Sequence, residues 1–247
     1  MARVVIVGAT SGIGRALASE FARRSAHELI LAARDLGEAT LVASDISIRF
    51  AARCRPALFD ICDYAQHENV LLNWTNGGPI EGLVLTVGLL SDQGEAETAL
   101  GVARQMIEVN FTACAMFLLV AARFFSRQGR GFICVIGSVA GDRGRRSNYI
   151  YGASKGALAI LTEGLRARLS PSGVRVTLVK PGFVDTRMTF GSVRQGSLLL
   201  VPPETAARQI YNAIVRGKTE AYVPPYWKYI MMAIRWMPRA VFQRLSL

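Results

Sequence analysis

Short apolar runs alternate along the chain with longer stretches in which apolar residues recur at helical spacing. Most of the short runs are continuously apolar, which indicates strands that are buried on both faces, as in a parallel sheet covered by helices. The expected strands are residues 4–7, 28–33, 57–60, 82–87, 131–138, 174–179 and 221–223. The expected helices are residues 12–24, 63–74, 97–126, 149–169 and 203–216.

This alternation predicts an α/β fold: a doubly wound, Rossmann-type, seven-stranded parallel sheet with helices on both faces. We find no internal repeat and no linker long enough to divide the chain, so residues 1–223 are expected to form one domain and residues 224–247 a C-terminal extension. The irregular stretch 182–200 follows a strand. It is therefore expected at the carboxyl edge of the sheet, where it would act as a lid that decides the substrate.

Composition and charge narrow the class of protein. The 247 residues are 51% hydrophobic and 19% charged, which excludes a disordered or low-complexity chain. The net charge of +11 indicates an acidic partner, which is a nucleotide, a nucleic acid or an anionic membrane. Because the four cysteines lack metal-ligand or CxxC spacing, we expect reduced thiols and no metal site.

The start of the chain and its apolar stretches bear on localisation. A strand-like run begins at Val4, so no signal peptide is expected. No apolar stretch is expected to reach the roughly 18 residues that span a bilayer. These features exclude the secreted and multi-pass membrane classes and predict a cytoplasmic protein.

A glycine-rich turn joins the first strand to the first helix, with the spacing Gly-x3-Gly-x-Gly. Glycine allows a tight turn and a close approach of the backbone to a pyrophosphate, while the helix N-terminus offers free N–H groups. The alternative is a tight turn that binds no ligand. The cofactor contacts expected here are Gly8, Thr10, Ser11, Gly12, Ile13 and Gly14.

The end of the second strand selects the cofactor in this kind of fold. An acidic residue there binds the adenosine ribose, whereas an arginine accepts a 2′-phosphate. Here the strand ends at Ala33 and is followed by Arg34 and Asp35. NADP(H) is therefore preferred, with NAD(H) as the alternative if Arg34 stacks on adenine or is merely solvated.

Three polar residues form a candidate catalytic group. Tyr151 and Lys155 are four apart, so they share one helix face, and a nearby cation lowers the pKa of a phenol. Such a phenol can protonate a carbonyl oxygen as a hydride arrives. Ser138 ends a buried strand and would face the same crevice.

Together these residues resemble the short-chain dehydrogenase/reductase family over residues 4–223. The spacing of 13 residues between Ser138 and Tyr151 is that of the family. The resemblance further rests on the glycine turn, Asp60 after the third strand, Asn110, Tyr151-x3-Lys155 and Pro181-Gly182. It implies the fold described above and a nicotinamide-dependent oxidoreductase.

The resemblance also implies roles for the matching residues. Tyr151 is the acid/base, Lys155 lowers its pKa and holds the nicotinamide ribose, and Ser138 polarises the substrate carbonyl. Asn110 holds a water in a proton relay. The other implied cofactor contacts are Asp60 and Ile61 at the adenine, Gly88 through its backbone, and Pro181, Gly182, Val184 and Thr186 around the nicotinamide. Taken alone, Asn110 could instead be an amide bonded to backbone, and Asp60 a helix cap.

The chain departs from the family pattern at two places. Val7 stands where the family has a threonine, and Leu85-Thr86-Val87-Gly88 replaces an Asn-Asn-Ala-Gly run. The amides of that run are gone, so the hydrogen bonds of the loop must be rebuilt by other groups.

The expected function is NAD(P)H-dependent interconversion of a ketone and a secondary alcohol. The alternative is a catalytically weak redox sensor or a nucleic-acid-associated protein, motivated by the positive charge. No recognition motif supports the latter, so no nucleic acid is expected.

The helix at 97–126 is apolar nearly all round, which favours a homodimer or homotetramer. The loop 141–146 holds three arginines that either bind a substrate phosphate or are solvated.

The extension 224–247 combines basic and aromatic residues and contains no acidic residue. This composition suits the headgroup layer of an anionic membrane, and we expect two short helices broken at Pro238 on the inner membrane face. The alternative is a tail packed on its own subunit or on a partner. The tail also resembles that of reductases acting on lipid-linked sugars, such as decaprenylphosphoryl-2-keto-erythro-pentose reductases, which implies a lipid-linked or lipid-like carbonyl substrate.

Overall fold

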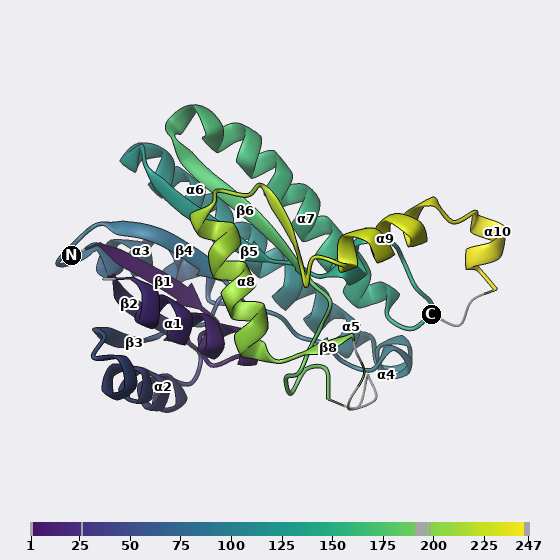
Figure 1. Ribbon diagram of the computed structural model, residues 1–247, viewed down its shortest axis with the longest axis horizontal. Helices are drawn as coiled ribbons and strands as arrows, with labels where there is room; N and C mark the ends of the chain where they lie inside the picture. Colours follow the sequence, from purple (N-terminus) through teal and green to yellow (C-terminus); the bar gives the residue numbers. More distant parts are fainter. Residues whose placement is uncertain (1, 26, 191–196, 198, 245–247) are drawn as a thin grey trace.

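Seven strands form one sheet in the order β3-β2-β1-β4-β5-β6-β9, and every neighbouring pair is parallel (Figure 1). The computed structural model describes residues 2–25, 27–190, 197 and 199–244. The predicted seven-stranded parallel sheet is confirmed. Its strands are β1 (Arg3–Val7), β2 (Glu28–Ala33), β3 (Cys54–Leu58), β4 (Ile80–Leu85), β5 (Gly131–Ile136), β6 (Val174–Pro181) and β9 (Glu220–Val223).

Helices cover both faces of the sheet, as expected for a doubly wound fold (Figure 1). Successive residues of a strand point to opposite faces, so Val5 and Val7 join one core while Val4 and Ile6 join the other. The first core is closed by α3 (His67–Thr75), α6 (Ala113–Gln128) and α7 (Tyr149–Leu169). The second core is closed by α1 (Gly12–Arg24), α2 (Leu36–Phe50) and α8 (Pro203–Val215).

Several elements differ from the sequence prediction, α2 and β3 among them. Helix α2 was not expected, because the exposed Leu41 and Ile48 obscure its amphipathic pattern. The signal was at its start, where Asp35 accepts a hydrogen bond from the backbone N–H of Glu38 at 2.9 Å, an Asp-x-x-Glu cap. Strand β3 begins and ends earlier than the predicted 57–60. It contains Pro56, which is tolerated because β3 is an edge strand.

The predicted helix 97–126 is broken at Ala99, and its remainder is continuous. It consists of α4 (Gln93–Thr98), α5 (Leu100–Ile107), a π-helical turn at Glu108–Thr112, and α6. The expectation that no apolar stretch could span a bilayer was wrong. The continuous helix Leu100–Gln128 is long and apolar enough by length and composition, but half of its most apolar window is buried inside the protein. Phe117 and Leu118 are fully buried against the sheet, so a core helix explains the pattern.

The C-terminal extension forms α9 (Trp227–Trp236) and α10 (Arg239–Phe242), separated at Pro238 as predicted (Figure 1). One face of α9 packs on the domain, where Trp227 and Met231 are buried in a cluster with Val139. A two-stranded parallel ribbon, β7 (Phe183–Val184) with β8 (Leu200–Val201), joins the ends of the predicted lid. Residues 191–196 and 198 of that lid lie outside the described residues.

Candidate active site

A cavity of about 280 Å³ lies at the carboxyl edge of the sheet. Its walls come from the segments that follow β1, β4, β5 and β6, together with α7. This is the crevice in which open α/β sheets bind their ligands. The predicted site residues that line it are Ser11, Gly12, Ile13, Gly88, Ser138, Tyr151, Lys155, Pro181, Gly182, Val184 and Thr186.

Ser138 and Tyr151 are brought together by a short turn packed on α7. The Ser138 hydroxyl accepts a hydrogen bond from the backbone N–H of Ala140 at 3.1 Å and so begins the 3₁₀ turn Val139–Asp142. That turn contacts α7 closely, because a Cβ on Gly141 would lie only 2.7 Å from the backbone nitrogen of Gly156. The Ser138 side chain also hydrogen-bonds the Tyr151 side chain.

The pKa of Tyr151 runs against the sequence expectation. Burial raises the pKa of this phenol above its ordinary value, and the hydrogen bond with Ser138 lowers it only in part. The Lys155 ammonium lies 6.0 Å from the centre of the Tyr151 ring. In this structure Tyr151 is therefore a protonated acid at neutral pH, and the lowering expected from Lys155 does not prevail.

Lys155 is fixed by backbone carbonyls. Its Nζ donates to the carbonyl oxygens of Val87 at 3.1 Å and Ile136 at 3.5 Å, at the ends of β4 and β5. Burial lowers the pKa of this ammonium. A Cβ on Gly88 would lie 3.3 Å from Nζ, so a larger residue there would crowd the lysine.

Asn110 lies beneath the cavity in the π-helical turn and is fully buried. Its Oδ1 accepts from the backbone N–H of Leu89 at 2.7 Å, and its Nδ2 donates to the Leu89 carbonyl at 2.8 Å. The side chain therefore ties the long helix to the segment after β4. Both polar ends of its amide are satisfied by backbone, which is the alternative that the sequence left open.

Thr86 supplies hydrogen bonds in place of the missing amides. Its Oγ1 lies 2.8 Å from the carbonyl oxygen of Val7 and 2.9 Å from that of Gly8, and it can donate to one at a time. The Ser11 hydroxyl in turn donates to Thr86 Oγ1 at 3.4 Å. The side chain of Thr86 thus bonds the segment after β4 to the glycine turn, beside the backbone bond from the Thr86 N–H to the Val7 carbonyl at 2.9 Å.

The glycine turn has the shape of a phosphate cradle. Gly8 has a φ of +83°, which favours glycine, and a Cβ on Gly14 would lie 2.4 Å from the Gly8 carbonyl oxygen. The Ser11 hydroxyl caps α1 by accepting from the Gly14 N–H at 3.0 Å. Close packing of the turn on α1 leaves the helix N-terminus directed at the crevice, which fits a dinucleotide pyrophosphate.

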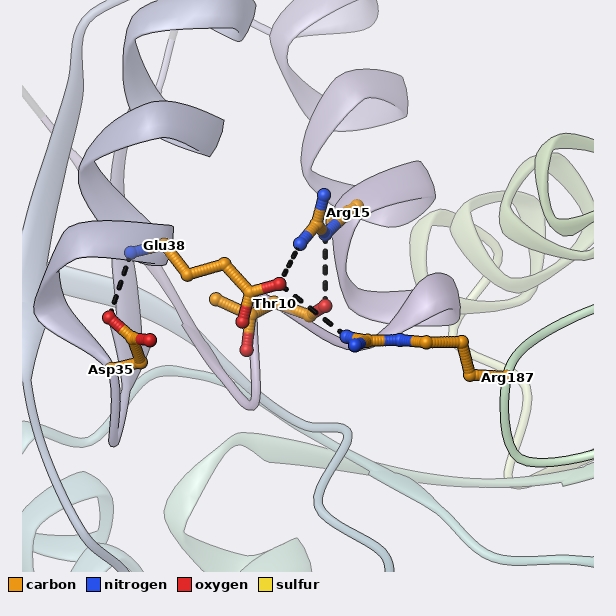
Figure 2. Close-up of polar contacts among 5 residues, drawn as sticks. All are labelled: Thr10, Arg15, Asp35, Glu38 and Arg187. Carbon is orange, nitrogen blue, oxygen red and sulfur yellow. Dashed lines mark hydrogen bonds and ion pairs between the residues drawn. The ribbon is translucent and has the colours of Figure 1, made fainter.

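Charged residues meet at the far end of the crevice, near the end of β2 (Figure 2). The Glu38 carboxylate pairs with Arg15 of α1 and, at 3.4 Å, with Arg187 from the segment after β7. Arg15 also donates to the Thr10 carbonyl at 2.9 Å. Arg34, the residue directly after β2, is exposed.

Several predicted cofactor contacts do not line the cavity. Asp60 caps the turn after β3 by accepting from the Cys62 N–H at 2.9 Å, and Ile61 is buried in the core. The lining likewise omits Arg34 after β2 and, in the glycine turn, Gly8, Thr10 and Gly14. Thr186 does line the cavity, and its Cγ2 lies 2.5 Å from where a Cβ on Gly12 would sit, so this threonine reaches the glycine turn.

The three arginines of loop 141–146 have different surroundings. Arg143 donates to the Met237 carbonyl at 2.8 Å and lies 3.9 Å above the Phe242 ring, so it holds the end of α9. Arg146 is exposed. Arg145 alone of the three lines the cavity.

Sequence reasoning missed several lining residues. Asn148, Phe183 and Met188 line the cavity beside the predicted ones. A signal existed for Asn148, which stands three residues before Tyr151 at the start of α7. Phe183 and Met188 follow β6 in irregular chain, where periodicity gives no information.

Comparison with known proteins is consistent with this site. The profile of the short chain dehydrogenase family matches residues 2–195. An uncharacterised oxidoreductase of Mycobacterium tuberculosis is 35% identical over 245 residues, which cover 99% of this chain and 97% of that protein. Carbonyl reductase family member 4 of Xenopus tropicalis is 28% identical over 212 residues, covering 83% of this chain and 87% of that protein.

Solved structures agree in fold. A short-chain dehydrogenase from Sphingobium yanoikuyae in complex with NADPH is 25% identical, with a TM-score of 0.81 over 97% of this chain and 98% of that one. A short chain dehydrogenase from Burkholderia cenocepacia in complex with NADP is also 25% identical, with a TM-score of 0.83 over 99% and 97% of the two chains.

Proposed function

The chain belongs to the short-chain dehydrogenase family and is an NAD(P)-dependent oxidoreductase of alcohols and ketones, and we propose that Tyr151 is its acid/base and NADP(H) its preferred cofactor. The observation that supports this most is a single cavity lined by the glycine turn, Ser138, Tyr151 and Lys155. The alternative of a redox sensor or a nucleic-acid-associated protein is not favoured, because the relatives above are oxidoreductases.

The residues present fit a nicotinamide dinucleotide. The glycine turn and the N-terminus of α1 would hold the pyrophosphate, while Lys155, Gly88 and Thr186 would hold the nicotinamide half. When bound, the reduced cofactor supplies the hydride. NADP(H) is favoured by Arg34, an exposed cation directly after β2, where this kind of fold distinguishes a 2′-phosphate from a free ribose hydroxyl. The two solved relatives described above were determined with NADPH and NADP.

In the reducing direction, Tyr151 donates its phenolic proton to the carbonyl oxygen as that oxygen gains negative charge. Ser138, already hydrogen-bonded to Tyr151, donates to the same oxygen and orients the carbonyl. The buried Lys155 ammonium stabilises the phenolate left behind, which offsets the cost of its burial. Oxidation of the alcohol runs these steps in reverse.

Tyr151→Phe tests the mechanism. Because only the transferable proton is lost, we expect NADPH-dependent carbonyl reduction to fall to background while the Kd for NADPH changes less than about threefold, a difference of roughly 0.7 kcal/mol. Tyr149→Phe is the matched control, since that tyrosine is 45% exposed on the same helix. Wild-type turnover in Tyr151→Phe would overturn the assignment.

Cofactor preference is tested by Arg34→Ala. Loss of a charge-assisted contact to the 2′-phosphate would weaken NADPH binding by about 1.5–3 kcal/mol and leave NADH binding nearly unchanged. Arg49→Ala is the control, because Arg49 is an exposed arginine at the other end of α2. Equal losses for both cofactors would mean that Arg34 does not contact the phosphate.

We further propose that the tail rests on an anionic membrane at the cytoplasmic face, close to a lipid-like substrate. The face of α9 opposite Trp227 exposes Tyr229, Met232 and Trp236, the last at 86%. Lys228 and Arg235 belong to the same helix, and Arg239 and Arg244 follow it in sequence. Aromatic and basic side chains together favour the headgroup layer.

Liposome flotation tests the membrane proposal with phosphatidylglycerol and phosphatidylcholine vesicles. Truncation at Pro225 would remove the buried Trp227, so the variant is Trp236→Ser with Arg235→Glu. Leu41→Ser on α2, where the side chain is 72% exposed, is the control. The intact protein and the control should float only with anionic vesicles at low salt. Equal flotation of the Trp236 variant, or none of the intact protein, would remove the membrane role.

A homodimer or homotetramer is proposed from the outer faces of α6 and α7. Met116, Leu119 and Ile160 are 42%, 37% and 74% exposed there, so the expected burial of this surface is not achieved within one subunit. Light scattering should give twice or four times the subunit mass of 26.9 kDa. Ile160→Glu should shift that mass toward the monomer, and a monomeric wild type would contradict the proposal.

A further inference from the structure

Arg145 places a positive charge in the same cavity as Tyr151. It precedes Tyr151 by six residues, and Asn148 precedes it by three; both line the cavity. The backbone N–H of Asn148 donates to the Arg145 carbonyl at 3.2 Å, so a turn at the start of α7 holds the two residues together. Whatever reacts at Tyr151 therefore lies within a cavity that also contains a guanidinium group.

Arg145 forms no ion pair among the described residues. Among the described residues, no carboxylate lies within ion-pair distance of it, and its Nε is buried with no hydrogen-bond partner. Asp142, three residues earlier, is already committed: Oδ1 pairs with Lys180 at 2.8 Å and Oδ2 accepts from Tyr222 at 2.7 Å. Burial lowers the pKa of this partly buried guanidinium, and the charge of Asp142 raises it only in part. A partly buried cation without an ion-pair partner is stabilised when a ligand supplies the anion.

Asn148 is also left with an unused group. It occupies the cap position of α7, yet its side chain caps no backbone N–H, and its Oδ1 is buried without a partner. Such groups are rare in folded proteins and each requires an explanation. A half-turn of the amide would present its two N–H donors to an anion beside Arg145.

The charges on the rest of the cavity lining also suit an anionic ligand. The described lining contains no aspartate or glutamate. Beyond Arg145, its cations are Lys155, which is bonded to backbone carbonyls, and Arg187, which pairs with Glu38 at the cofactor end. The remaining lining near Tyr151 is largely apolar, with Leu90 and Val139 among it.

We propose that the substrate carries an oxyanion, a carboxylate or a phosphate ester, that pairs with Arg145 while an apolar skeleton presents the ketone to Tyr151. This rests on the proposed function, because it assigns the carbonyl to Tyr151. The planar guanidinium matches both oxyanions in bidentate geometry. Of the three loop arginines, the proposal assigns the anion to Arg145 alone, because Arg143 holds α9 and Arg146 is exposed.

Paired ketones test the proposal. The carboxylate arm compares acetylbenzoates, with the two groups at different spacings, against their methyl esters. The phosphate arm compares acetylphenyl phosphates against the free phenols. The wild type should favour the anionic member of at least one arm by about tenfold to a hundredfold in kcat/KM, the range for a hydrogen bond to a charged group.

Arg145→Met should abolish that preference, measured within the variant as the ratio of kcat/KM for the anionic and the neutral ketone, whereas Arg145→Lys should retain part of it. Arg146→Met removes the same charge from an exposed neighbour and should keep the full preference. Equal turnover of both members by the wild type, or an unchanged preference in Arg145→Met, would overturn the proposal while ketone reduction stands.

Binding separates this failure from failure of the proposed function. Calorimetric titration of the anionic ketone into the NADP⁺-loaded protein should show about tenfold weaker binding in Arg145→Met than in Arg146→Met. If no ketone is reduced but Arg145→Met still binds the anionic ketone more weakly, the anion site is supported and the proposed ketone reaction is contradicted. If the two variants bind it equally, the anion site is contradicted at any level of turnover.

Discussion

Replacement of Gly182 by alanine tests how tightly the tail is joined to the active site. Gly182 lines the cavity, and on its other side the Trp227 indole of α9 packs against it. An added Cβ would lie 1.9 Å from Nε1 and 2.1 Å from Cε2 of Trp227, which no side chain can tolerate. Trp227 is only 3% exposed, so the indole has little room to move.

The cost of this overpacking is about 1–3 kcal/mol of unfolding free energy, since one methyl group forces a buried side chain to shift. Urea unfolding followed by tryptophan fluorescence measures it. Gly144→Ala is the control, because a Cβ there meets nothing within 4 Å. It should change the unfolding free energy by less than about 0.5 kcal/mol.

A double-mutant cycle with Trp227→Leu isolates the contact. In that background the space beside residue 182 is open, so Gly182→Ala should cost less than about 0.5 kcal/mol, and the coupling energy should be about 1–3 kcal/mol. Additive effects within about 0.5 kcal/mol would refute the reasoning and mean that the alanine is accommodated by the backbone of β6.

Three further outcomes are expected. Thr86→Val should lower the unfolding free energy in urea by only about 1 kcal/mol, because the carbonyls of Val7 and Gly8 keep their backbone donors; a loss above about 3 kcal/mol would contradict this account. Lys180→Met should cost about 3–5 kcal/mol in the same assay, since the 3% exposed Asp142 carboxylate loses its cation; a loss below about 1 kcal/mol would show that Tyr222 suffices. Because burial raises the pKa of Tyr151, carbonyl reduction should persist through mildly alkaline pH, and alcohol oxidation should rise with pH as the phenolate forms; a fall in reduction near neutral pH would contradict it.

The sequence predicted those elements whose local hydrophobic pattern matches the place they occupy in the folded protein. Strand β2 and helices α1 and α7 begin and end where the hydrophobic pattern places them. The positions of Tyr151 and Lys155 on one helix face follow from helical geometry alone. The carboxyl-edge placement of Ser138 follows from its position after a buried strand. These features depend on few long-range contacts, so the sequence is sufficient.

Other features depend on partners that are distant in sequence. The hydroxyl of Thr86 replaces an amide pair only because Val7 lies on the neighbouring strand. Asn110 bonds backbone because the helix widens into a π turn there. The pKa of Tyr151 depends on burial, which no spacing reveals. Likewise, the different surroundings of the three loop arginines depend on where α9 and β6 lie.

The cavity draws its walls from nearly the whole length of the chain, and this bears on the order in which it forms during synthesis. The glycine turn emerges from the ribosome well before the residues that support the other walls. Tyr222, which bonds Asp142 in the arginine loop, and Trp227, which packs behind Gly182, follow it by more than half of the sequence. A nascent chain can therefore complete its nucleotide cradle while the arginine loop and the wall at Gly182 still lack their supports. The substrate side of the pocket becomes rigid only once translation has delivered the final strand and the helix that follows it.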